Sequence, residues 1–117
     1  MIEANPKLRP WRDAVTWHAS EAVKAHGGFG EDGVALTLWF RFARPKSHLR
    51  ADGMVRPAAP AFPGTTAGDI DKLSRGVIDA MTEAGCWRND TQVVQLTAAK
   101  LFSPVAGLEV KAWSRDE

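Results

Sequence analysis

The chain has 117 residues, of which 44% are hydrophobic and 25% are charged, which is typical of one globular domain with its own core. No apolar run approaches the roughly 20 residues that a membrane helix requires, so we expect no membrane partner. The N-terminus shows no charged region followed by an apolar stretch, and the one cysteine, Cys86, has no partner for an internal disulfide. These features predict a single domain over residues 1–117 in the cytoplasm, with Cys86 as a small hydrophobic residue in or near the core.

The net charge is +1, from 15 basic and 14 acidic residues, so the total charge alone does not indicate a nucleic-acid-binding protein. The distribution is more informative, because residues 41–56 contain five bases and one acid, and residues 69–117 contain eight acids and six bases. A basic segment followed by acidic residues suits a metal-dependent enzyme that acts on a polyanion. A solvated, charged loop accounts for the same pattern equally well.

The first half of the chain predicts one helix and one strand. Pro10 suits the first position of a helix, apolar residues recur at helical spacing over residues 11–26, and Gly27-Gly28 ends the helix. His18 falls on or beside this apolar stripe, where we expect a packed or hydrogen-bonded side chain rather than a ligand. In residues 34–42 a large apolar side chain stands at every second position, from Val34 to Phe42, which predicts a half-buried strand.

The second half predicts a long irregular link, a helix and two strands. Residues 43–68 contain four prolines and three glycines, so we expect a functional or disordered loop. The helix lies between Gly68 and Gly85, with apolar residues on one face and Asp71 and Arg75 together on the other. Residues 93–102 and 108–113 read as strands, most economically joined as a hairpin. The expected fold is α+β, with two helices packed on a small mixed sheet of about three to four strands.

Three carboxylates flank the second helix. Asp69 and Asp71 stand at its start, and Asp90 precedes the next apolar run. If the following strand returns beside the helix, all three are able to reach one divalent cation, which prefers oxygen ligands. The alternative is that Asp69 caps the helix, Asp71 complements its dipole and Asp90 is a turn residue. Asp79 shares the polar face with Arg75, and a salt bridge is the expected role there.

The sequence around these acids resembles the RusA family of Holliday junction resolvases. The similarity is carried by Asp69-Ile70-Asp71-Lys72-Leu73, Asp79-Ala80-Met81, Ala84-Gly85 and the stretch from Trp87-Arg88-Asn89-Asp90 to Val94. Weaker similarity lies upstream, in Pro10-Trp11-Arg12 and Arg44-Pro45-Lys46-Ser47.

The resemblance implies a homodimeric, Mg²⁺-dependent endonuclease that cuts four-way DNA junctions in recombination and repair, with Mn²⁺ as the alternative ion. It implies that Asp69, Asp71 and Asp90 hold the metal and that Arg75, or Lys72 one turn earlier, stabilises charge on the phosphate. Phosphate contacts to DNA are expected from six basic residues, namely Arg9, Arg12, Arg44, Lys46, Arg50 and Lys100.

The chain departs from the family pattern at three places. Arg75 stands where a lysine is usual, Asn89 replaces the first residue of an Asp-Asp pair, and no apolar strand precedes the first helix. We therefore expect an open sheet edge. Two alternatives remain beside the enzyme: a structure-specific DNA-binding protein that does not cut, and a small interaction domain whose acids are caps and turn residues.

Overall fold

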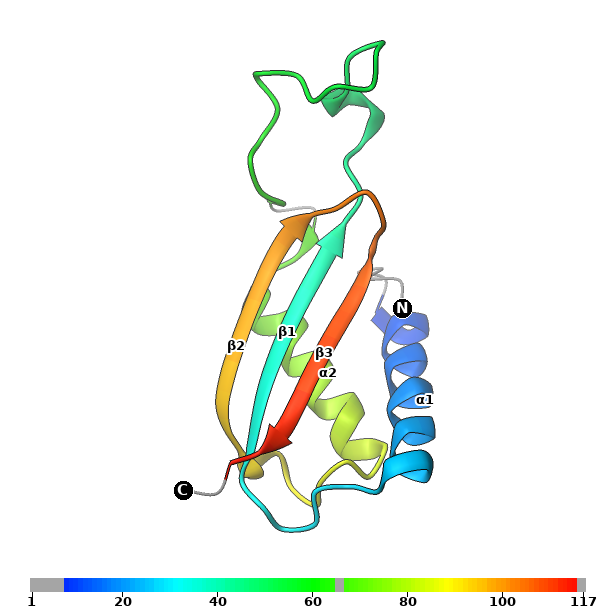
Figure 1. Cartoon of the computed structure of the whole chain (residues 1–117), viewed down its shortest axis with the longest axis vertical. Coiled ribbons are helices and arrows are strands. Elements are labelled where there is room, and N and C mark those ends of the chain that lie inside the picture. The colour runs from blue at the N-terminus through cyan, green and yellow to red at the C-terminus, as the bar shows by residue number, and fades with distance from the viewer. Residues whose placement is uncertain (1–7, 65–66, 116–117) are drawn as a thin grey trace.

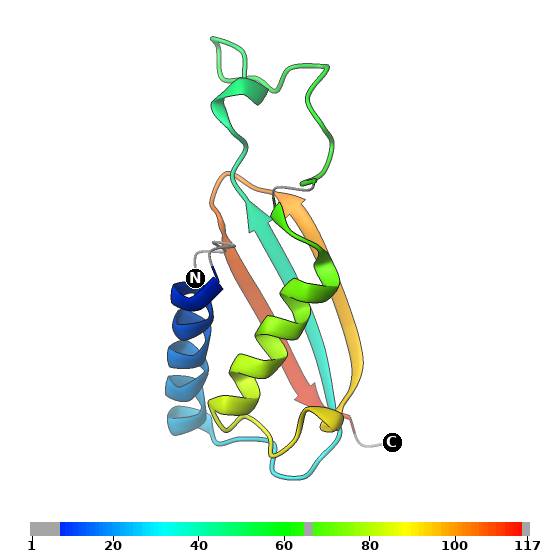
Figure 2. The same cartoon turned by 180° about the vertical axis from the view of Figure 1, so that it is seen from behind.

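The computed structural model describes residues 8–64 and 67–115, apart from the side chains of residues 8–10. Two helices lie on one face of a three-stranded mixed sheet, as Figures 1 and 2 show from opposite sides. The predicted α+β class with two helices on a small mixed sheet is confirmed. Within the described residues, no helix combines the length and the apolar character that crossing a bilayer demands.

Strand β1 (Val34–Phe42) lies at the centre of the sheet, parallel to β2 (Val93–Phe102) and antiparallel to β3 (Gly107–Ser114). The predicted alternation along β1 is confirmed, because Val34, Leu36, Leu38 and Phe40 have no exposed surface. A central strand forms backbone hydrogen bonds along both of its edges. The most apolar strand is therefore buried without unpaired backbone groups.

The hairpin predicted between the last two strands is wrong. Strands β2 and β3 lie on opposite sides of β1, so residues 103–106 cross the end of β1 instead of forming a tight turn. Neighbouring strands are about 4.8 Å apart, and four residues easily span the two intervals between β2 and β3. Ser103 N donates a hydrogen bond to Phe42 O at 2.9 Å, which attaches the crossing to the end of β1.

Helices α1 (Leu8–His26) and α2 (Ile70–Glu83) confirm the two predicted helices, with α1 beginning two residues before Pro10, the predicted first position. They cover the core face of β1. Trp11 of α1 packs over Gly76 of α2, where an added Cβ would lie 3.2 Å from the indole ring. His18 is exposed on α1 with its ring perpendicular to that of Trp17, so it packs on a surface neighbour rather than in the core.

The link that carries Cys86 lies just after α2 and is part of the core. The Cys86 side chain is buried, and desolvation by this burial raises the pKa of its thiol. The thiol is therefore protonated at neutral pH and behaves as a small apolar group. The prediction that Cys86 has a packing role is confirmed.

Residues 43–64, which we call the arm, leave the end of β1 and project beyond the sheet before the chain returns to α2 (Figure 1). The arm is irregular, as predicted, except for the short 3₁₀ helix η1 (Lys46–His48). Its tip is held by an isolated bridge between Leu49 and Val55 and by a hydrogen bond from Arg50 N to Met54 O. The arm therefore has a defined conformation despite its prolines and glycines.

The burial of β1 predicts a large cost for truncating its side chains. Phe40→Ala removes a completely buried ring, so we expect the free energy of unfolding to fall by about 3–5 kcal/mol. Chemical denaturation of the variant and the wild type measures this difference. Phe62→Ala is the matched control, because the Phe62 side chain is 69% exposed and its loss should change stability by less than about 0.5 kcal/mol. Equal effects of the two substitutions would contradict the assignment of β1 as the core strand.

Candidate active site

Asp69 and Asp71 stand at the start of α2, directly after the left-handed Gly68. Asp69 occupies the N-cap position with extended backbone angles, but its side chain accepts no capping hydrogen bond. Its carboxylate instead lies 3.7 Å from the Lys72 ammonium. Asp71 lies in the first turn and is exposed. The Asp69 side chain therefore does not cap the helix, contrary to the alternative considered above. Asp71 has the position that complements the helix dipole.

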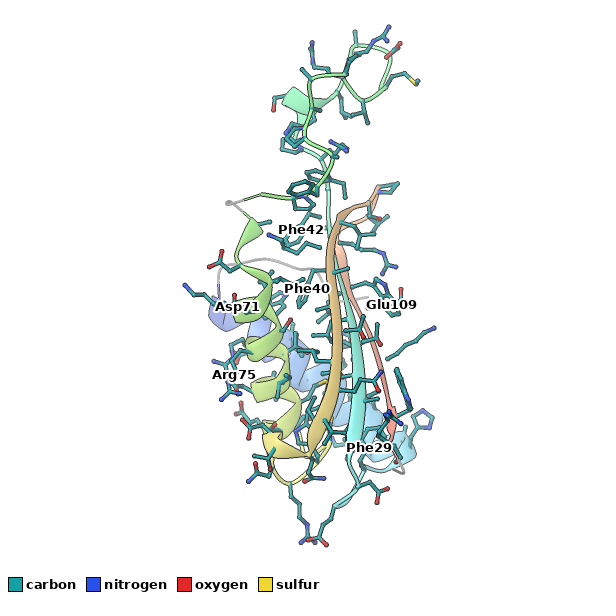
Figure 3. All side chains as sticks on the ribbon, turned by 90° about the vertical axis from the view of Figure 1, so that its left-hand side faces the viewer. Phe29, Phe40, Phe42, Asp71, Arg75 and Glu109 are labelled. Carbon is teal, nitrogen blue, oxygen red and sulfur yellow. The ribbon has the colours of Figure 1, made fainter. Side chains whose placement is uncertain are left out.

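Asp71 and Arg75 lie one turn apart on the outer side of α2, as the helical spacing predicted (Figure 3). Both line a cavity of about 450 Å³ between α2 and β2, whose apolar wall includes Ile78 and Leu96. The same cavity is lined by Ser74, which is 3% exposed and whose hydroxyl has no hydrogen-bond partner in the described part of the chain. Sequence reasoning missed Ser74, because its position in the helix gives no signal beyond a polar residue beside the apolar face.

Arg75 connects the acidic residues of this surface. Its guanidinium lies 3.1 Å from the Asp90 carboxylate and 3.6 Å from that of Asp79. Asp79 also lies 3.7 Å from the guanidinium of Arg12 on α1. The expected structural salt bridge of Asp79 is confirmed, and Asp79 links the two helices.

The loop before β2 holds Asp90 in place. Asp90 begins the 3₁₀ helix η3 (Asp90–Gln92), and Asn89 caps it by accepting a hydrogen bond from Thr91 N. Gln92 accepts hydrogen bonds from the backbone of Arg88 and Asn89 and donates to Gly30 O and Asp32 O. Asn89 therefore performs a capping role, and Gln92 ties the loop to the link between α1 and β1.

The three candidate metal ligands do not converge in this structure. No three acidic, histidine or cysteine side chains of residues 8–64 and 67–115 lie close enough together to hold an ion. Asp71 and Asp90 instead flank Arg75, and Asp69 pairs with Lys72. The oxygen donors suit Mg²⁺ chemically. Their arrangement does not suit an ion, because the carboxylate of Asp90 is paired with Arg75 and the three acids do not meet.

Most basic residues that were expected to contact DNA form contacts within the chain. Arg12 pairs with Asp79, Arg50 pairs with Asp52 at 3.3 Å, and Lys100 donates to Gly68 O at 2.8 Å. Arg44 donates to Pro60 O and lies over the Phe102 ring, while Lys46 is exposed on the arm. Side-chain contacts of Arg9 lie outside the described residues. The basic residues thus fall into two groups, one on the arm and one around α2.

Comparison with known proteins assigns the chain to a family. The family model described as endodeoxyribonuclease RusA matches residues 2–112, which include both helices, the arm and all three candidate carboxylates. A comparison with curated proteins found no match. The match covers the long arm as well as the sequence stretches around the acids.

The site geometry predicts that Arg75 contributes little to folding. Its ion pairs are formed by side chains that are at least one-third exposed, so Arg75→Gln should change the free energy of unfolding by less than about 1 kcal/mol. Asn89→Ala, which removes the cap of η3, should cost about 1 kcal/mol. Urea denaturation of both variants tests this order. A loss above about 2 kcal/mol for Arg75→Gln would make Arg75 a structural residue first.

Proposed function

Because the chain belongs to the RusA family of endodeoxyribonucleases, we propose that it is a Mg²⁺-dependent enzyme that cuts four-way DNA junctions in recombination and repair. The observation that carries the proposal is the grouping of Asp71 and Arg75 on the exposed side of α2 with Asp90 of η3, which pairs with Arg75. Acidic and basic side chains side by side on an exposed surface suit a reaction at a phosphodiester, where a cation and a charged donor are both required.

In this proposal Asp69, Asp71 and Asp90 hold Mg²⁺, or Mn²⁺ in its place. When bound, such an ion orients and activates water and neutralises charge on the scissile phosphate. Asp90 becomes available when Arg75 turns from its carboxylate, and both side chains are exposed enough to change partners.

Arg75 gains a second role through the same exchange. A guanidinium released from Asp90 is placed beside the cavity between α2 and β2, where it can donate two parallel hydrogen bonds to a phosphate. Lys72 lies one turn earlier and is exposed beside Asp69, so it supplies a compact positive charge at the start of the helix. These two residues are the proposed hydrogen-bond donors to the phosphate in the catalytic site.

The remaining basic residues are proposed to position the DNA. Phosphate contacts fix the register of a nucleic acid without reading its sequence, which suits recognition of a branched shape. The proposed contacts are Arg9, Arg12, Arg44, Lys46, Arg50 and Lys100. Those that already bind a neighbour in the chain still have free N–H donors, because each guanidinium carries five and the Lys100 ammonium carries three.

We also propose a homodimer, because a two-fold protein matches the two-fold symmetry of a four-way junction. The outer edge of β2 supports this proposal. It pairs with no other strand of the described chain, and Val94 and Leu96 on β2 are 61% and 45% exposed. Exposed apolar edge strands pair readily with another chain.

A structure-specific DNA-binding protein that does not cut is the second candidate. It is favoured by one observation, the ion pair that keeps the carboxylate of Asp90 on Arg75 rather than beside Asp69 and Asp71. Under this alternative the basic residues bind the junction and the acids stabilise the surface of α2.

A cleavage assay on a synthetic four-way junction distinguishes the candidates. With Mg²⁺ present, we expect the wild type to cut and Asp71→Asn to cut at least about 100-fold more slowly, because one ligand of the ion is lost. Asp13→Asn, an exposed acid on α1, is the control and should leave the rate unchanged. Junction binding without cutting by the wild type would favour the second candidate, and neither binding nor cutting would leave an interaction domain.

The exchange of partners at Asp90 predicts opposite effects of one substitution. Arg75→Gln removes the competitor for Asp90, so Mg²⁺ should bind about two- to fivefold more tightly, as expected for loss of a surface ion pair. The same variant should cut more slowly, because a hydrogen-bond donor to the phosphate is lost. Isothermal titration calorimetry with MgCl₂ and the cleavage assay measure the two effects.

Lys24→Gln serves as the control for this comparison, because Lys24 forms a similar exposed ion pair with Glu21 on α1. It should alter neither Mg²⁺ binding nor cleavage. Weaker Mg²⁺ binding by Arg75→Gln would contradict the proposed competition.

A further inference from the structure

The arm and the end of the sheet enclose a second cavity, separate from the one beside α2. Its volume is about 340 Å³, and aromatic rings form much of its lining, from Phe42 and His48 to Phe62 and Phe102. Phe42 lies where the arm leaves the sheet (Figure 3). The described residues that line the cavity include no carboxylate. The cavity therefore combines flat apolar surfaces with an absence of negative charge in that lining.

Phe62 is the unusual member of this lining. Its side chain is 69% exposed, more than any other large hydrophobic residue of the described chain. Pro60 and Pro63 flank it and restrict the backbone, and Pro63 itself is buried. A large ring held in solvent by a restricted backbone loses little conformational entropy when a flat ligand stacks on it.

Arg44 fixes the position of this segment relative to the sheet. Its guanidinium donates to Pro60 O at 2.8 Å and lies 4.1 Å from the centre of the Phe102 ring. The His48 ring meets Phe102 edge-on at 5.5 Å. One face of Phe102 is thus already occupied by a cation, and Phe62 is left as the exposed ring of the cavity.

The charge of the arm indicates what kind of ligand the cavity receives. The arm carries four Lys or Arg side chains, namely Arg44, Lys46, Arg50 and Arg56, and a single acid, Asp52, which is paired with Arg50. Flat apolar rings inside a positively charged segment suit a nucleotide, because its nucleobase can stack on the rings while the Lys and Arg side chains attract its phosphate.

The cavity also lies beside the proposed catalytic residues along the chain. Ala67 lines it, and Gly68 and Asp69 follow directly. Lys100 of β2 donates a hydrogen bond to Gly68 O, which holds the segment before α2 against the sheet. The cavity therefore lies close to the start of α2.

We infer that the cavity receives one unstacked nucleobase of the DNA substrate and that Phe62 is its stacking partner. This inference rests on the proposed function, because it takes branched DNA as the ligand. Bases at a branch point are more easily unstacked than those within a duplex. Stacking on an aromatic ring tolerates any base, so the contact recognises the branch rather than a sequence.

The test uses the full chain and a four-way junction that carries 2-aminopurine beside the branch point, in EDTA so that no cleavage occurs. Wild-type protein should raise the 2-aminopurine fluorescence, because the base leaves the stack of its neighbours. Phe62→Ala should reduce this change and weaken junction binding about 5- to 150-fold. Phe62→Leu should bind as weakly as Phe62→Ala, because it restores apolar volume without a flat ring.

Two controls make the result specific. Met54→Ala removes another exposed apolar side chain of the arm, 62% exposed, which does not line the cavity, and it should bind like the wild type. The salt dependence of binding should be the same for Phe62→Ala and the wild type, because no charge is removed. Circular dichroism of the variants verifies that each one is folded.

The outcomes separate this inference from the proposed function. If wild type and Phe62→Ala bind the junction equally and give the same fluorescence change, the stacking role is overturned and the proposed nuclease stands. If the wild type binds no junction, both are overturned. If Phe62→Ala dissociates a dimer in sedimentation experiments, Phe62 belongs to a contact between copies and the stacking role is overturned.

Discussion

The apolar face of strand β1 can be buried only if strands pair with both of its edges and helices cover it, and this requirement determines where the candidate site lies. Strand β2 pairs in parallel with β1, so the chain between them must return along the sheet, and α2 makes that return. Asp71 and Arg75 are consequently carried on a helix whose opposite face is fixed in the core. Their own side of α2 is left exposed beside the edge strand.

Local periodicity predicted β1 and α2 well because each one has a clear apolar face. The alternation along residues 34–42 and the helical spacing after Gly68 both describe how single segments meet a core, and the structure agrees with both. The order of the strands was not predictable in the same way. Whether β3 pairs with β2 or with β1 depends on which strand benefits most from two neighbours, and that comparison involves segments far apart in the sequence.

The candidate site likewise combines features that local sequence predicts with features that depend on distant segments. The shared face of Asp71 and Arg75 follows from the angle between helical positions, which local sequence contains. The contact between Arg75 and Asp90 depends on the register of β2, on the cap at Asn89 and on the hydrogen bonds from Gln92 to residues about 60 positions earlier. Such contacts have no local signal. Phe62 had one, an aromatic residue between prolines, but its exposure depends on how Arg44 braces the arm.

The arm is inserted between two elements whose ends are fixed by the core, since β1 ends and α2 begins at the same end of the sheet (Figure 2). The entropic cost of closing a loop rises only slowly with its length, so the arm can be lengthened, shortened or exchanged at little cost to the fold. The proposed catalytic acids and the proposed DNA-contacting surface of the arm are therefore able to vary independently. One scaffold can in this way retain its chemistry while its range of branched substrates changes.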